Sequence, residues 1–320
     1  IARIDYSDST QGALLLEPER TNVILYSNDF NQWTTSGTIT SGQDGLGVNP
    51  DAWIYQNSTP TSAVYINNTL SGVQTMSGFF KKNSTNGIRL YAFGDVNCNA
   101  YFDLNNGTVD LQQNIISADI VPFGDDWFRC SMTFNQTNSR CDIYITNNAN
   151  TQVLGEITMQ YMQLELGSYA TSYIPTNGAT ATRNQELCNN ATPEINSEEG
   201  VLYAEISALA DDGTTRIISL SDGTTANRVN LFFDTTNTLR AFITGVPSIA
   251  TAAVITDNNK VALKFKSGDI SVWLNGTEVA TNTSTISLSG LSNLSFNQVG
   301  GSPFFGNTKD LKIFNTALTD

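Results

Sequence analysis

Two short segments of the sequence combine aromatic rings with amide side chains, the residue types that bind sugars. Trp273 is followed by Asn275 at a turn, and Trp53 and Tyr55 flank a single residue in a segment rich in Asn. The flat C–H faces of sugars stack on aromatic rings, and amide groups supply hydrogen bonds that fix orientation. Trp273, Asn275, Trp53 and Tyr55 are therefore the candidate ligand-binding residues.

Each of these candidates also has a purely structural interpretation. Alternation along 270–275 places Ile270, Val272 and Leu274 on one face, so Trp273 points away from their core. There it forms either an exposed platform or a packing contact with a neighbouring module or an adjacent chain. Of the two rings at positions 53 and 55, we expect one to fill the core.

The sequence offers no placed catalytic group. It contains no histidine, which removes the commonest general base and every Ser–His or Cys–His nucleophile. Glycan hydrolysis needs two carboxylates about 5–9.5 Å apart, whereas the adjacent side chains of Asp125 and Asp126 diverge. Glu17 and Glu19 flank Pro18, which indicates a structural turn. We therefore expect no catalytic residues and no enzymatic activity.

We also expect no metal site and no cofactor. The segment that begins at Asp95 starts like a calcium loop, but Ala100 stands where the sharp turn needs glycine and no glutamate closes the loop. The turn formed by Asp211, Asp212 and Gly213 is explained by hairpin chemistry alone. The four cysteines contain no CxxC pair, and we expect reduced, mostly buried thiols.

The composition indicates an uncharged polar surface over real hydrophobic cores. Of the 320 residues, 40% are hydrophobic and only 14% are charged, against a usual charged share of about 25%. The formal net charge of −14 repels phosphate backbones and anionic lipid, so nucleic-acid binding is not expected. No apolar run approaches the roughly 20 residues that cross a bilayer, so membrane insertion is not expected either. Such surfaces are typical of extracellular β proteins and virion parts.

Short stretches of alternating polarity, separated by polar turns, recur along the sequence. In 127–134, for example, every second residue is apolar, which is typical of a half-buried antiparallel strand. No stretch keeps a helical period for three turns, so helix content should be small. A polar turn is predicted at 135–139. The other predicted strands are 62–70, 73–81, 88–93, 140–146, 156–166, 200–207, 215–221, 228–234, 239–244, 260–266, 270–275, 294–299 and 309–314.

The polar segment 188–199, CNNATPEINSEE, interrupts this pattern and carries a proline. We interpret it as a linker between a module at 1–187 and a module at 200–320. Strands at this spacing are typical of β-sandwiches. The predicted fold class is all-β, with two antiparallel β-sandwich modules in series. The sequence begins at Ile1 without a start methionine, and we interpret it as part of a longer or processed chain.

Two stretches bracket the first module. The first is RIDY at 3–6 with LLLEPERTN at 14–22, followed by Tyr26, Ser27, Phe30 and Trp33; the second is QLELGSYATSYIPT at 163–176, followed by ATR at 181–183. Together they resemble a carbohydrate-binding-like jelly-roll module of phage tail-fibre and other virion proteins and of some bacterial surface proteins. The resemblance implies that Trp33 and Trp127 are core residues.

Charged residues inside these stretches have two interpretations. Glu17 and Arg20 could form a site, but an ion pair that pins the first strand to the sandwich is the simpler explanation. Pro18 between them fixes the backbone and removes a donor, which suits an edge. We expect a similar structural role for Arg183.

The second module carries VLYAE at 201–205, VWLNG at 272–276 and DLKIFNTALT at 310–319. These stretches resemble a laminin-G/concanavalin-like lectin domain. The resemblance implies a sandwich of two antiparallel sheets. It does not by itself imply a lectin site, because the fold hosts many functions.

Three functional hypotheses follow. The first is a virion or tail-fibre surface protein, located on the virion or otherwise outside the cell, that acts as a glycan-binding adhesion module. It would form a homo-oligomer beside other fibre subunits, and multivalency would convert weak contacts with a cell-surface glycan or polysaccharide into firm attachment. The second is a ligand-free structural or decoration module of a virion or bacterial surface filament. The third is the accessory binding region of a larger polysaccharide-degrading enzyme.

Overall fold

The computed structural model describes residues 3–6, 11–46 and 51–319. They form antiparallel strands and one short 3-10 helix, η1 (Phe30–Gln32), which confirms the all-β fold class. Within these ranges no helix is long and apolar enough to cross a membrane. The chain divides into two compact units: residues 19–184, and the described residues up to Pro18 together with those from Gln185 onward.

The 19–184 unit is built on one large antiparallel sheet. Its strands are β3 (Arg20–Asn22), β4 (Thr34–Thr35), β5 (Gly37–Gln43), β6 (Ala52–Asn57), β7 (Ala63–Lys82), β8 (Gly87–Gly94), β9 (Cys98–Asp103), β10 (Thr108–Gln113), β11 (Ser117–Pro122), β12 (Trp127–Thr146), β13 (Glu156–Leu166) and β14 (Ala181–Arg183). The order in the ten-stranded sheet is β10-β9-β8-β12-β7-β13-β6-β5, with β11 on β12 and β4 on β7. A separate ribbon pairs β14 with β3.

Two strands of 20 residues each, β7 and β12, run antiparallel along their whole length. The polar turn predicted at 135–139 is wrong, because this stretch lies inside β12. Its residues pair with β7, so that Gln136 lies opposite Gly72 and Thr137 opposite Ser71. The polar side chains that indicated a chain reversal have partners on both neighbouring strands: Thr137 shares a hydrogen bond with Ser71 of β7, and Gln136 donates to the carbonyl of Ala92 of β8.

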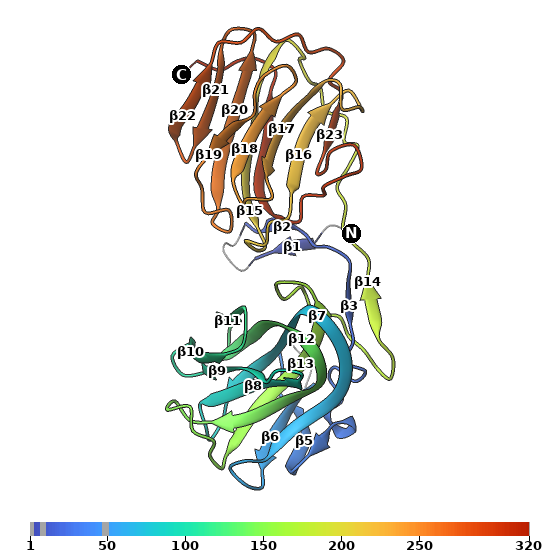
Figure 1. Ribbon diagram of the computed structural model, residues 1–320, viewed down its shortest axis with the longest axis vertical. Coiled ribbons are helices and arrows are strands. Elements are labelled where there is room, and N and C mark those ends of the chain that lie inside the picture. Colours follow the sequence, from blue (N-terminus) through green and yellow to red (C-terminus); the bar gives the residue numbers. More distant parts are fainter. Residues whose placement is uncertain (1–2, 7–10, 47–50, 320) are drawn as a thin grey trace. The chain divides into compact units, whose positions relative to one another are not determined.

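At this point the paired strands bend instead of reversing. Gly72 has a left-handed backbone, with φ of 108°, and the register of β12 shifts between Asn138 and Arg140. Glycines and bulges of this kind curve a sheet without ending it. The β7 ribbon in Figure 1 shows the curvature.

The bend lets the two halves of the sheet face each other across a hydrophobic core. The first half of β12 pairs with β11 and the second half with β8. Buried side chains come from both halves, among them Phe80 and Met132 from one and Leu90 and Ile143 from the other. Trp33 and Trp127 are buried, as their interpretation as core residues requires.

The second unit is a sandwich of two antiparallel sheets (Figure 1). Its strands are β1 (Arg3–Asp5), β2 (Ala13–Leu16), β15 (Glu199–Ala208), β16 (Arg216–Ser221), β17 (Arg228–Phe233), β18 (Leu239–Ile243), β19 (Ile249–Thr251), β20 (Asn259–Lys266), β21 (Ile270–Leu274), β22 (Thr277–Asn282), β23 (Asn293–Ser295) and β24 (Gly306–Phe314). The seven-stranded sheet has the order β1-β2-β24-β15-β20-β21-β22, and the five-stranded sheet has the order β19-β18-β17-β16-β23.

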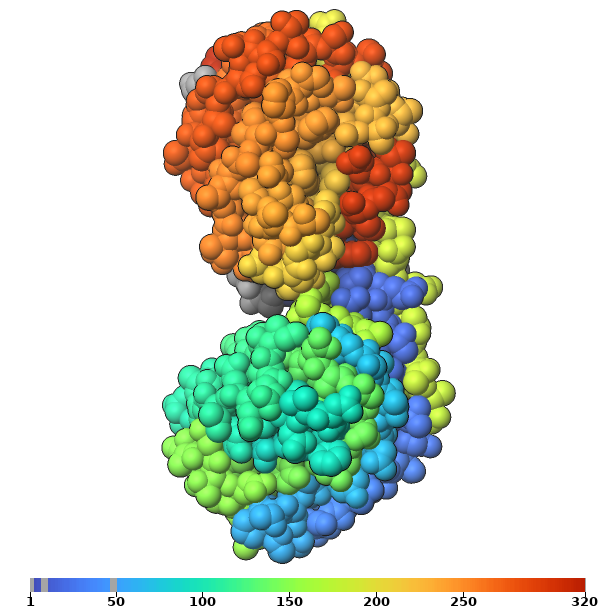
Figure 2. Space-filling view, in the orientation of Figure 1, coloured from blue at the N-terminus to red at the C-terminus, as the bar shows by residue number. Residues whose placement is uncertain are grey.

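The core of this sandwich lies between the two sheets. Leu202, Leu263 and Val272 project inward from the seven-stranded sheet, and Leu231 and Phe233 project inward from the five-stranded sheet. Segments that are distant in sequence close the sandwich: in Figure 2 the red C-terminal part lies against the gold segment around β16, where the backbone of Ile217 donates to Ser302 at 3.3 Å.

The domain boundaries differ from the predicted ones at both ends of the first module. Leu14 and Leu16 of β2 pair with Thr308 and Gly306 of β24, so the N-terminal strands extend the C-terminal sandwich. The predicted linker 188–199 also belongs to this unit. The sequence could not show either point, because hydrophobic alternation identifies a strand but not the strand with which it pairs.

The segment 188–199 follows the edge of the five-stranded sheet. The backbone amides of Ala191 and Leu294 each donate to the other's carbonyl, at 3.0 and 2.7 Å, and Phe296 donates to the carbonyl of Cys188 at 2.8 Å. Cys188 and Ile195 pack against the sandwich core. Backbone groups hold this segment in place, so its polar side chains do not make it a linker.

Glu17 and Arg20, which were predicted to pair with each other, each have an ion-pair partner within their own unit. Glu17 accepts from Arg3 at 2.5 Å, and Arg20 pairs with the buried Glu165 at 3.6 Å. Arg183 has the expected structural role, since it donates to the carbonyl of Ser172 at 2.8 Å.

The four cysteines are free thiols, as expected. Cys98, Cys130 and Cys141 are buried, and Cys188 is half-buried. Burial raises the pKa of Cys141 to about 12, so that this thiol stays protonated and unreactive at neutral pH.

Gly72→Ala tests whether the bend depends on the left-handed backbone. There is room for the methyl group, because the nearest atom is Leu166 Cδ2 at 3.9 Å. We expect the free energy of unfolding to fall by about 1–2 kcal/mol, the cost of a Cβ in this conformation. The control Gly301→Ala has room and an ordinary backbone, and should change stability by less than about 0.5 kcal/mol. Equal denaturation midpoints for the two variants would contradict the role given to Gly72.

Candidate functional site

The outer face of the seven-stranded sheet carries a row of side chains that crosses four strands. Trp273 of β21 lies opposite Ala262 of β20, Ala262 lies opposite Tyr203 of β15, and Tyr203 lies opposite Lys312 of β24. Neighbouring strands are about 4.8 Å apart, which places the backbones of Trp273 and Tyr203 about 10 Å apart. The small side chain of Ala262 leaves a hollow between the two rings.

Alternation along β21 sets the direction of Trp273. Ile270 and Val272 are buried in the core of the sandwich, and Trp273 lies half-buried on the opposite face. The predicted direction of this side chain is therefore confirmed. Its indole Nε1 donates to Ser271 Oγ at 3.2 Å, which fixes the orientation of the ring on the sheet.

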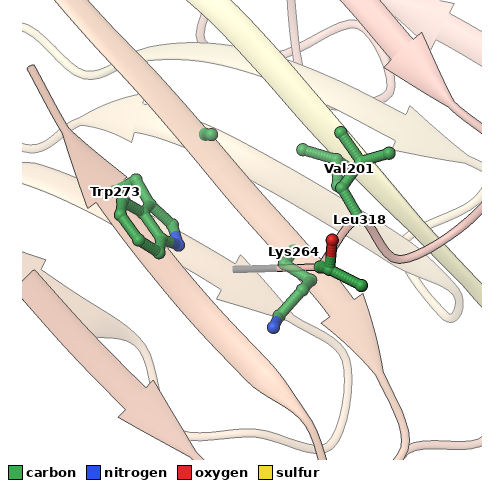
Figure 3. Close-up of a pocket in the computed structure, with 6 residues that line it drawn as sticks. Val201, Lys264, Trp273 and Leu318 are labelled. Carbon is green, nitrogen blue, oxygen red and sulfur yellow. The ribbon is translucent and has the colours of Figure 1, made fainter. Parts of the chain in front are cut away.

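An open groove with a volume of about 290 Å³ begins at Trp273. Its lining consists of Val201, Ala262, Lys264, Trp273, Leu318 and Thr319. In Figure 3 the indole lies on one side, Val201 and Leu318 lie on the other, and Lys264 lies between them. The C-terminal segment that follows β24 thus supplies one wall of the groove.

Lys264 brings a positive charge to a mostly apolar groove. Its side chain is only 6% exposed and pairs with Asp269, with 3.0 Å between Nζ and Oδ1. The Asp269 side chain is 55% exposed, so its carboxylate is open to a ligand. The aliphatic stem of Lys264 adds apolar surface to the groove, while its ammonium stays compensated.

Tyr203 extends the row beyond the groove. Burial, together with the nearby carboxylates of Glu205 and Asp310, raises the pKa of Tyr203, so its phenol is neutral at physiological pH. Lys312 Nζ lies 5.3 Å from the centre of the Tyr203 ring and also forms an ion pair with Asp310. Its hydroxyl group also forms a hydrogen bond with the Glu205 side chain.

This arrangement fits a ligand with a flat apolar face and a polar rim. The indole and the aliphatic walls contact the apolar face. The carboxylate of Asp269 can accept a hydrogen bond from a hydroxyl group, and the hydroxyl of Thr319 can donate or accept one.

Trp53 and Tyr55, predicted as ligand-binding residues, are core residues. They share one face of β6, as predicted, but that face is buried, with exposures of 9% and 0%. Trp53 packs edge-on against Phe30 at a centroid distance of 6.0 Å. Burial raises the pKa of Tyr55, whose hydroxyl donates to the carbonyl of Ser36 at 3.4 Å. The Asn-rich flanks indicated a loop, whereas β6 lies inside the sheet between β5 and β13.

Asn275, the fourth predicted ligand-binding residue, is a turn residue. Asn275 and Gly276 have φ of 51° and 85° and form the two-residue turn between β21 and β22. The Asn275 side-chain oxygen accepts from the backbone of Lys260 at 2.9 Å. Its backbone N–H donates to the Lys260 carbonyl at 2.8 Å. Asn275 lies outside the lining of the groove, and its side-chain oxygen is engaged within the turn.

The oxygen-rich turn at 211–213 has protein partners. Asp212 pairs with the buried Arg216 at 2.8 Å, and the backbone of Gly213 donates to the side chain of Asn237 at 2.8 Å. Across the described residues, no three potential metal-ligating side chains come together.

Sequence reasoning missed Lys264, Ala262, Val201 and Leu318. Alternation in β20 places Ala262 and Lys264 on the outer face, so the sequence could have identified these two residues as neighbours of Trp273. The burial of Lys264 was not predictable, because it arises where the C-terminal segment with Leu318 lies over this face. That placement depends on tertiary contacts and leaves no periodic pattern.

No protein-family model and no curated protein matches the sequence. Among solved structures, the chain is similar to the CBM40 module of a Ruminococcus gnavus IT-sialidase bound to α2,3-sialyllactose, with 16% identity and a TM-score of 0.34, over 39% of this chain and 79% of that chain. It is also similar to domains LG4–5 of the mouse laminin α1 chain, with 9% identity and a TM-score of 0.30, over 98% and 93% of the two chains.

A third similar structure is a Trypanosoma rangeli sialidase in complex with sialic acid, with 11% identity and a TM-score of 0.34, over 84% of this chain and 60% of that chain. All three TM-scores lie below 0.5. The ligands of these proteins are therefore not carried over to this chain.

The turn role of Asn275 predicts a specific pattern of stabilities. Asn275→Ala should lower the free energy of unfolding by about 1–2 kcal/mol, because alanine is strained at positive φ. Asn275→Gly should cost less, since glycine adopts this backbone freely. Thermal or chemical denaturation measures both variants. Equal losses for Ala and Gly would show that the side-chain bond to Lys260, and not the backbone, is what matters.

Proposed function

We propose that the protein is a glycan-binding adhesion module without catalytic activity, and that the Trp273 groove is its binding site. The observation that carries the proposal is the half-buried indole of Trp273. It lies on the outer face of a sheet, beside the ion pair of Lys264 and Asp269. An aromatic ring held next to charged hydrogen-bonding groups is the combination that sugar recognition requires.

In this proposal a pyranose ring stacks on the indole and occupies the hollow above Ala262. A sugar hydroxyl donates to Asp269, whose exposed carboxylate remains an acceptor while it pairs with Lys264. The bond between Trp273 and Ser271 holds the ring in place before binding, which lowers the entropy lost on association. One such contact is weak, because stacking contributes only about 0.5–1.5 kcal/mol beyond the burial of area.

Weak sites become effective when several copies act together. We therefore propose a homo-oligomeric protein displayed on the surface of a virion fibre or another extracellular filament, beside other fibre subunits. The support for this setting is the resemblance of the stretches at 3–33 and 163–183 to virion modules. The absence of histidine from the sequence supports binding without catalysis.

Trp273→Ala tests the groove directly. A glycan array identifies a ligand, and calorimetry then measures its affinity for the wild type and the variant. We expect the affinity per site to fall about threefold to tenfold. The melting temperature should change little, because Trp273 lies on the face opposite the core. The control is Val279→Ala, which truncates an apolar side chain that is 40% exposed and lies outside the groove lining.

Three results would contradict the proposal. Unchanged affinity in Trp273→Ala would remove this residue from the site, and a large fall in melting temperature would make it a packing residue. Absence of binding to every glycan tested would favour a ligand-free structural or decoration module. Release of reducing ends above a boiled control would contradict the lack of catalysis and favour a part of a polysaccharide-degrading enzyme.

A further inference from the structure

A second group of aromatic rings lies on the outer face of the 19–184 unit, across strands β9, β8, β12 and β7. Cross-strand pairing places Arg89 between Tyr101 and Tyr144, and places Asp142 between Tyr91 and Tyr65. Their neighbours along the strands, such as Leu90 and Ile143, fill the core. We call this surface the tyrosine–arginine face; it comprises Tyr65, Arg89, Tyr91, Tyr101, Arg140 and Tyr144.

Arg89 is the unusual residue of this face. Its guanidinium carbon lies 4.4, 5.3 and 5.4 Å from the ring centres of Tyr91, Tyr101 and Tyr144. Its Nε atom is buried and has no hydrogen-bond partner, and among the described residues no carboxylate pairs with it. Three ring faces stabilise the charge, but the buried Nε–H donor has no acceptor.

The neighbouring Arg140 lies on the same face, and its guanidinium has hydrogen-bond partners. It holds Asp142 with two hydrogen bonds, Nε to Oδ1 at 2.7 Å and Nη2 to Oδ2 at 2.8 Å. Tyr144 donates to the same carboxylate at 3.2 Å. Asp142 is fully buried, so its charge is committed to Arg140. The same carboxylate lies close enough to attract Arg89, so one carboxylate is shared by two arginines on this face.

A stacking surface continues along β8 beyond Arg89, formed by Tyr91 and by Phe93, whose ring centre lies 5.1 Å from the Arg140 guanidinium carbon. Phe93 follows Tyr91 at the next outward position of β8, and the two ring centres are 6.5 Å apart. Phe93 is 44% exposed, an unusual position for a large apolar ring. Burying a polar donor without an acceptor is costly, and exposing a phenylalanine is unfavourable as well. A ligand that carries an anionic group and an apolar face would balance the charge of Arg89 and cover the exposed ring of Phe93.

We infer that the tyrosine–arginine face binds an acidic sugar, with the sugar carboxylate on Arg89 and the pyranose ring stacked on Phe93 and Tyr91. The planar guanidinium matches a carboxylate through two parallel hydrogen bonds. A single uncompensated charge fits a monoanion. A polyanion such as nucleic acid would also meet the repulsion of a chain with net charge −14. The inference extends the proposed glycan binding to a second site that does not depend on Trp273.

The test compares two sugars that differ in one group. Methyl glucuronide carries a carboxylate where methyl glucoside carries a hydroxymethyl group. NMR titration of the full chain should show the glucuronide binding at least about tenfold more tightly, through a charge-assisted pair that salt weakens. The shifted amides should lie on β8 and β12. Equal affinity for the two sugars, or no binding of either, would overturn the inference.

Variants locate the site. Arg89→Gln should remove the preference for the glucuronide, and Phe93→Ala should weaken binding of both sugars. If Arg89→Gln does not fold, the affinity of Phe93→Ala for the two sugars tests whether this face binds them. The matched control is Arg228→Gln in the other unit, where the guanidinium also lies over a ring, 4.8 Å from the centre of Phe242. An unchanged preference in a folded Arg89→Gln, or unchanged binding in Phe93→Ala, would contradict the inference.

Trp273→Ala separates this inference from the proposed function. It should leave the glucuronide preference intact. If Trp273→Ala weakens glycan binding while Arg89→Gln and Phe93→Ala have no effect, only the groove binds sugar and the second site fails. If Arg89→Gln and Phe93→Ala weaken sugar binding and Trp273→Ala does not, the second site is supported and the proposed role of the groove is contradicted.

Discussion

The strict alternation of side chains along paired strands is the constraint on which both candidate binding surfaces depend. In β20, Val261, Leu263 and Phe265 fill the core, so Ala262 and Lys264 must face outward. A shift of one residue in register would exchange the two faces and bury the wrong set. The hydrophobic core therefore fixes the position of residues that never touch it, and the same holds for Arg89 on β8.

The two surfaces combine the same chemistry in different proportions. Each places aromatic rings beside a cation on the outer face of a sheet, within a chain that has few charged residues. Lys264 is buried and paired with Asp269, which makes its groove nearly neutral. Arg89 is held by tyrosine rings, without a carboxylate of its own. The first surface suits a neutral sugar, and the second suits a sugar with a carboxylate.

Much of the fold and the direction of Trp273 could be predicted from the sequence, and the incorrect predictions share one cause. Alternation predicted strand 127–134 and the outward direction of Trp273, because both are local properties. It could not tell that 135–139 continues a strand, since the partners of those polar residues lie on the distant strands β7 and β8. Nor could it tell that Trp53 and Tyr55 face the core, because alternation places the two rings on one face of β6 without showing which face is covered by the rest of the core. Pairing between distant strands is the information that the local pattern lacks.

The central claim is that an outward sheet face, and not a core aromatic, contacts the glycan. The chain has four tryptophans; Trp33, Trp53 and Trp127 are at most 9% exposed, so each indole N–H reports on a distinct environment. Titration of isotope-labelled protein with a neutral glycan that binds, the class of sugar assigned to the Trp273 groove, tests the claim most directly when it is followed through the four indole N–H signals. We predict that the Trp273 signal alone shifts in proportion to occupancy, with assignment by Trp273→Phe. Saturable binding that leaves the Trp273 signal unmoved, or that shifts a buried indole instead, would contradict the account.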